Sequence, residues 1–188
     1  MAADFFFADP TFQIPAMLPL AAFKWQHLGN AEVQNAIAAE EQYLAFHIYM
    51  LGNLRHTRAG QVHLRPYSHE IGLSVRAGAI KAAILLAASI AEAALRTLAE
   101  FRGYRLNENP ARRTFGNVIK AWEVNGVPLA DVAPIWEHIK AMHTTRNFVH
   151  LHVAAGAEDA DWGRVLEREN ELLHGAIAAI NHIATIRP

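Results

Sequence analysis

Residues 79–98, which read AIKAAILLAASIAEAALRTL, decide the fold. Alanine and large aliphatic residues fill almost all of this stretch, and alanine has the highest helix propensity of all residues. We therefore predict one long helix over residues 68–102, whose middle is the central and most buried part of the protein. Its most apolar run, residues 82–91, is too short to cross a bilayer. A core helix is expected, and no membrane partner.

Glu92 is the only acid inside this apolar middle. Moving a carboxylate out of water is costly unless a cation or hydrogen-bond donors compensate for the lost hydration. We therefore expect Glu92 to form an ion pair with a basic side chain from another part of the fold.

The spacing of apolar residues predicts further helices on both sides of the central one. They are expected over residues 31–58, over 111–124 with Asn109 and Pro110 at the start, from a cap at Asp131 into residues 143–152, and from 159 or 161 to about 186. Asn125-Gly126 is expected to end the helix over 111–124. No stretch shows the sustained alternation of a strand. The predicted fold class is all-α, an antiparallel bundle of four to five helices with short connections.

Two regions of different character are expected along the chain. Residues 1–30 mix phenylalanines and prolines without a helical period, so we predict an irregular N-terminal arm that lies on the domain or on a partner. Residues 31–188 are predicted to form the helical bundle domain. The start of the chain lacks the positive charge of a signal peptide, which makes the cytoplasm the expected location.

The composition narrows the possible chemistry. The chain has no cysteine, which excludes disulfides, thiolate metal sites and cysteine nucleophiles. Its net charge is −1, which argues against a broad basic surface that coats nucleic acid. Eleven histidines are a large number for 188 residues, and they indicate where acid–base chemistry is to be sought.

Residues 143–152, which read HTTRNFVHLH, hold the strongest candidate site. In a helix, Arg146 and His150 lie on the same face, one turn apart. A guanidinium binds the anionic oxygens of a phosphodiester, and a neighbouring imidazole moves a proton near neutral pH. Arg146 is also the first candidate partner for Glu92, together with the histidines of this stretch.

Three segments give the chain a resemblance to the HEPN superfamily of helical-bundle ribonucleases and binding modules. Residues 146–150, RNFVH, resemble its Arg-Asn…His signature. Residues 89–95, SIAEAAL, are similar to its second-helix pattern with an acid among apolar residues. Residues 114–121, TFGNVIKA, followed by NGVP, are similar to the short helix and turn before the signature. The resemblance covers roughly residues 35–185.

The resemblance implies a metal-independent endoribonuclease that acts as a homodimer, with no cofactor. Arg146 would neutralise the phosphoryl oxygens, and Asn147 would fix the phosphate or cap the local turn. His150 or His152 would act as general acid or base. The usual spacing of the superfamily fits His152, whereas a compact spacing on the face of Arg146 fits His150. Glu92 would orient Arg146 or a histidine.

Two alternatives remain beside the ribonuclease. The first is a non-catalytic HEPN-like module that binds protein or nucleotide, and an antitoxin or another protein is a possible partner in either case. The second is a metal site built from histidines, although the sequence has no HExxH pattern. A basic segment around residues 55–76 is either an ordinary solvated surface or an RNA-contact patch, whose expected members are Arg55, Arg58, Arg65 and Arg76.

Overall fold

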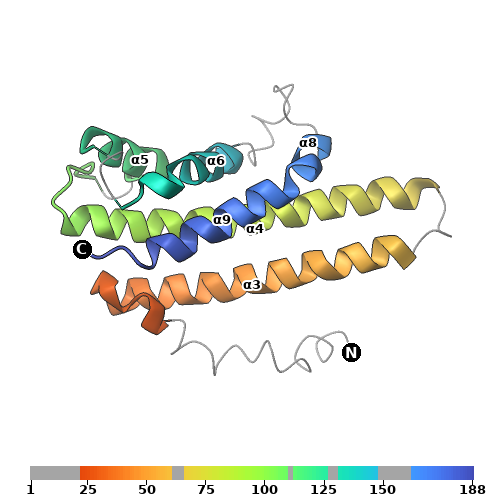
Figure 1. Cartoon of the computed structure of the whole chain (residues 1–188), viewed down its shortest axis with the longest axis horizontal. Coiled ribbons are helices and arrows are strands. Elements are labelled where there is room, and N and C mark those ends of the chain that lie inside the picture. Colours follow the sequence, from red (N-terminus) through yellow and green to blue (C-terminus); the bar gives the residue numbers. More distant parts are fainter. Residues whose placement is uncertain (1–21, 61–65, 110–111, 127–130, 148–161) are drawn as a thin grey trace.

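The computed structural model describes residues 22–60, 66–109, 112–126, 131–147 and 162–188, and every regular element in these ranges is a helix (Figure 1). This confirms the all-α prediction and the helical-bundle architecture. In chain order the elements are η2 (Gln26–Leu28), α3 (Ala31–Gly60), α4 (Pro66–Phe101), α5 (Phe115–Val124), η5 (Ala133–Ile135), α6 (Trp136–Asn147), α8 (Trp162–Glu167) and α9 (Glu169–Ile183).

Helix α4 is the centre of the bundle, as the sequence predicts. It contacts η2, α3, α5, α6, α8 and α9. Its apolar side chains are buried on more than one face, among them Ile80, Ala83, Ile84, Ala87, Ala91 and Leu95. The small alanine side chains let neighbouring helices approach closely on several sides. The segment Arg76–Phe101 is long and apolar enough to cross a membrane, a property that the core helix of a soluble protein shares.

The long helices α3 and α4 run in opposite directions. Helix α3 lies antiparallel beside α4 along most of its length, and α6 and α9 cover the other side of α4 (Figure 1). Helix α6 runs against α4 and α9, whereas α9 runs in the same direction as α4 and crosses it. Helix α3 inserts Ile37, Leu44 and Leu51 into the shared core.

The described end of the N-terminal arm is part of this core. Trp25 and Leu28 are fully buried, and the Trp25 indole donates a hydrogen bond to Glu41 of α3 at 2.9 Å. Lys24 donates to Asn181 of α9 at 3.0 Å. Residues 22–30 thus lie on the bundle, as expected of an arm that packs on the domain, and they anchor to it through Trp25 and Leu28. Residues 1–21 lie outside the described residues.

The start of α5 differs from the prediction. The helix begins at Phe115 rather than at residue 111, because Thr114 is extended, with φ −69° and ψ 162°. The guanidinium of Arg113 donates to the Asn107 carbonyl at 2.6 Å and to the Glu100 carboxylate at 2.8 Å. These bonds hold the preceding residues outside the helix. Asn125 and Gly126 end α5 as predicted, and Gly126 adopts the positive φ of 82° that suits glycine.

The starts of α6 and α9 also differ. Asp131 does not cap a helix: its carboxylate accepts a hydrogen bond from Arg102 at 2.6 Å, which lowers the pKa of Asp131, and the turn η5 precedes α6. The last predicted helix is divided at Arg168, whose φ of −96° and ψ of 10° separate α8 from α9. The predicted loop over residues 154–160 lies outside the described ranges.

Arg76 is buried, which corrects its predicted role as an RNA contact. The Arg76 side chain is 5% exposed and that of its partner Glu169 is 10% exposed. Arg76 binds the Glu169 carboxylate through two nitrogens, one of them at 2.9 Å, and donates to the Leu51 carbonyl at 3.1 Å. This guanidinium joins α3, α4 and α9 and is closed to an external phosphate.

Replacing Glu169 by glutamine leaves the buried Arg76 cation without its counter-charge. We expect the free energy of unfolding to fall by roughly 3–5 kcal/mol. Urea denaturation followed by circular dichroism measures the loss. The matched control is Glu137→Gln on α6, whose ion pair with Lys140 is exposed and should contribute less than about 1 kcal/mol. Equal midpoints for the two variants would contradict the proposed role of Arg76.

Candidate functional site

The candidate site is the ion pair between the last turn of α6 and the middle of α4. Arg146 donates through Nη1 to a carboxylate oxygen of Glu92. This confirms the prediction that the acid in the apolar helix pairs with a basic group of another helix. The Arg146 side chain is 37% exposed and that of Glu92 is 19% exposed. The pair therefore lies at the edge of the core, where solvent reaches the guanidinium.

The start of α5 lies beside His143, one turn before Arg146 on α6. The His143 ring packs edge-on against Phe115, with centroids 5.6 Å apart and an interplanar angle of 82°. A Cβ atom on Gly116 would lie 3.0 Å from His143 Nε2, so the glycine permits this close approach. Helices α4, α5 and α6 all contact one another. The described parts of the three segments that carry the sequence resemblance therefore lie on three helices that contact one another.

The geometry leaves part of the Arg146 guanidinium available. A guanidinium has five N–H donors in a planar fork. Within the described part of the chain, Nη1 donates to Glu92, and no hydrogen bond is formed by the other N–H groups. The pair can therefore orient the guanidinium through one nitrogen and present the rest of the fork to an anion. A phosphate or carboxylate group would fit this arrangement.

Several predicted site residues lie at or beyond the edge of the described structure. Asn147 is the last residue of α6, and its side chain is outside the described part. His150, His152 and Arg65 lie wholly outside the described residues. Arg55 and Arg58 are on the last turns of α3, but their side chains are outside the described part too. Their predicted roles stay predictions.

Metal-binding geometry is absent among the described residues: no three or more His, Asp or Glu side chains there converge on one point.

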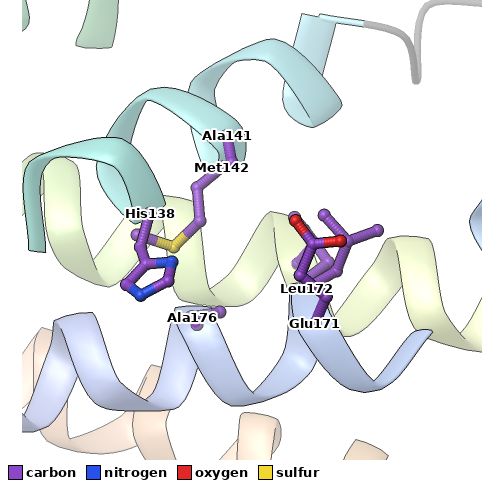
Figure 2. A pocket seen from close by; sticks show the side chains of 8 residues that line it. His138, Ala141, Met142, Glu171, Leu172 and Ala176 are labelled. Atoms are coloured by element: carbon purple, nitrogen blue, oxygen red, sulfur yellow. The ribbon is translucent and has the colours of Figure 1, made fainter. Parts of the chain in front are cut away.

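A small hollow between α6 and α9, which no sequence motif predicts, is lined by two further polar side chains, His138 and Glu171 (Figure 2). Figure 2 shows the His138 ring over Ala176 and the Glu171 carboxylate nearer the start of α9. The hollow measures about 10 Å³, room for about one water molecule. Hydrogen bonds from Arg168 at 2.6 and 3.0 Å lower the pKa of Glu171. This hollow is too small for a substrate.

Comparison of the chain with protein families, with curated proteins and with solved structures finds no match in any of the three.

Proposed function

We propose that this protein is a metal-independent endoribonuclease of the HEPN type, with its active site at Arg146. The observation that supports the proposal is the position of Arg146. It is held by Glu92 from the central helix, flanked by the start of α5, and still partly open to solvent. Of the two arginines that pair with an acid across the packed helices at α4, Arg76 is closed to solvent, whereas Arg146 can be reached by an external phosphate.

In the proposed reaction, the ribose 2′-hydroxyl attacks the adjacent phosphorus while the bond from phosphorus to the 5′-oxygen breaks. The products are a 2′,3′-cyclic phosphate and a free 5′-hydroxyl. Negative charge grows on the non-bridging oxygens, and Arg146 stabilises it there, an effect of roughly 3–4 kcal/mol for one preorganised donor. His150 or His152 takes the 2′-hydroxyl proton or gives one to the leaving oxygen, worth about 10²–10⁴-fold.

Glu92 and Asn147 have supporting roles in this proposal. Glu92 is a positioning residue, because its carboxylate fixes the plane of the guanidinium through Nη1. Asn147 follows Arg146 at the end of α6, where its amide either contacts the phosphate or satisfies the free carbonyl groups of the last turn. The proposal assigns Glu92 no proton transfer.

The central test is cleavage of RNA in the presence of EDTA. Purified protein should cut total RNA and leave ends with a cyclic phosphate, since no metal takes part. Arg146→Ala should abolish the cleavage, and Glu92→Gln should reduce it while the fold is kept. Products are followed on denaturing gels, with the cyclic phosphate identified by mass spectrometry.

The matched control for this test is Lys140→Ala, which removes a cation from an exposed ion pair on the same helix. Its cleavage rate should equal that of the unchanged protein. Cleavage that persists in Arg146→Ala would locate the active site elsewhere. Cleavage lost on addition of EDTA would replace the mechanism by a metal-dependent one.

Single substitutions of the two histidines distinguish the two spacings. We expect His150→Ala to abolish cleavage and His152→Ala to leave most of it. If the helix continues past Asn147, His150 shares the face of Arg146 and His152 does not. Circular dichroism checks that both variants fold. The opposite ranking would show that the chain turns after α6 and that His152 serves the phosphate.

A homodimer is part of the proposal. One guanidinium and one imidazole are a small catalytic set, and a two-fold axis close to the α6 helices would bring two such sets into one cleft. Light scattering at micromolar concentration should therefore give twice the mass of the 188-residue chain, about 42 kDa from the 20.8 kDa of one copy. A monomer that still cleaves RNA would contradict the composite cleft.

The second candidate function is a non-catalytic module that binds protein or nucleotide. The observation in its favour is that Glu92 already supplies Arg146 with a counter-charge, so that the pair is complete without a substrate. This alternative predicts that neither the unchanged protein nor Arg146→Ala cuts RNA. In that case the ion pair serves only to attach α6 to α4.

A further inference from the structure

An open groove of about 500 Å³ lies between the α4–α5 connection and the outer face of α5. Arg105, Leu106 and Asn107 form one wall, and Asn117, Lys120 and Val124 line the other. Its volume is in the range of small-ligand sites, which is enough for about one or two nucleotide units. The sequence resemblance gave no reason to expect a binding surface here.

The groove presents two cations that have no counter-charge in the described structure. Arg105 and Lys120 are exposed and make no hydrogen bond or ion pair with a described residue. Two neighbouring arginines differ in this respect, since Arg102 pairs with Asp131 and Arg113 with Glu100. Glu108 is the acid on the same lining. The groove therefore carries a net charge of +1, from two cations and one carboxylate.

The local charge is unusual for this chain. Residues 102–125 contain five arginines and lysines against two glutamates, a net of +3, whereas the whole chain has a net charge of −1. An excess of positive charge confined to one region attracts an anionic polymer to that region.

The remaining lining suits a nucleotide. Val124 is 77% exposed, and Leu106 is half-buried, so an apolar surface lies open beside the cations. The Asn125 amide nitrogen donates to the Ala121 carbonyl at 2.7 Å, which leaves its amide oxygen as an acceptor for a base amino group. Single-strand sites combine cations for phosphates, a surface for base faces and polar groups for base edges. In this groove aliphatic side chains provide the surface that aromatic rings more often provide.

Helix α5 connects the groove to the region of Arg146. Helix α5 begins at Phe115, which packs on His143 one turn before Arg146, and it ends at Val124 in the groove. Ten helical residues span roughly 15 Å. A strand bound in the groove can therefore reach the candidate site within a few nucleotides.

We infer that this groove binds a single-stranded RNA segment beside the bond presented to Arg146, with Arg105 and Lys120 at its phosphates and Leu106 and Val124 against its bases. The choice of RNA over an acidic peptide rests on the proposed function. The charge, shape and lining of the groove do not depend on cleavage at Arg146.

Binding of an uncleavable strand tests this inference separately from catalysis. The probe is a fluorescent oligouridylate in which every 2′-hydroxyl is replaced by fluorine, and anisotropy is measured over a range of salt concentrations. Lys120→Glu and Arg105→Glu should each weaken binding about tenfold and lower the salt dependence by about one counterion. Lys140→Glu, the same charge reversal on α6, should change the affinity less than about twofold, because it removes no phosphate contact.

The outcomes distinguish this inference from the proposed function. If the protein cuts no RNA but binding of the strand still depends on Lys120 and Arg105, the RNA-binding groove is supported and the proposed nuclease activity is rejected. If the groove variants and the Lys140→Glu control bind the strand with equal affinity, the inferred RNA-binding role of the groove is overturned, whatever the cleavage result. A displacement experiment compares polyglutamate with unlabelled oligouridylate as competitors for the labelled strand. Release of the strand at a lower concentration of polyglutamate than of oligouridylate would overturn the RNA assignment in favour of an acidic peptide. Circular dichroism and urea midpoints confirm that the variants are folded.

Discussion

The structure depends on the burial of α4 on more than one side. A helix that is apolar around most of its circumference must be covered around most of it, and a single partner helix cannot do this. In this protein α3 covers one side, while α6 and α9 cover the other. Alanine at many contact positions brings these helices close, which increases the buried apolar area without large side chains. The positions of the shorter elements α5 and α8 follow from this arrangement.

Two charged residues within the covered part of α4 fix how its neighbours align. Arg76 pairs with Glu169 at the start of α9, and Glu92 pairs with Arg146 at the end of α6. The two residues are sixteen positions apart, roughly 24 Å along the helix axis. Apolar packing alone tolerates a shift of one helix along another, whereas a charge at the edge of a core tolerates little displacement from its partner.

The two ion pairs differ in exposure to solvent. Arg76 is closed off, whereas Arg146 keeps over a third of its side-chain surface in contact with solvent.

The sequence predicted what depends on local pattern and missed what depends on tertiary packing. The long apolar helix, the Asn125-Gly126 helix end and the pairing of Glu92 with a basic group all follow from a short window of residues and simple electrostatics. Arg76 was assigned to a basic surface because it follows a run of arginines and histidines, and only the packing of α9 reveals its partner. The late start of α5 depends on bonds from Arg113 to Asn107 and Glu100. The groove forms where the segment with Arg105 and the segment with Lys120 come together, so no local sequence motif predicts it.

In the proposed ribonuclease, a carboxylate beside the guanidinium that is to bind phosphate is unfavourable at first sight, because Glu92 would repel the same anion that Arg146 attracts. The geometry resolves the conflict. Glu92 takes Nη1, and the planar fork retains other N–H groups for a phosphate. The carboxylate weakens ground-state attraction for any passing anion, but it also holds the guanidinium in one orientation. Catalysis gains only from interactions that are stronger in the transition state than in the ground state. In the transition state, more negative charge lies on the oxygens of the pentavalent phosphorus. A donor that is already oriented toward those oxygens stabilises this charge better than a freely rotating donor does. In the proposal, the strand is held mainly by contacts away from the reacting bond, where the α4–α5 connection places Arg105 and α5 places Lys120.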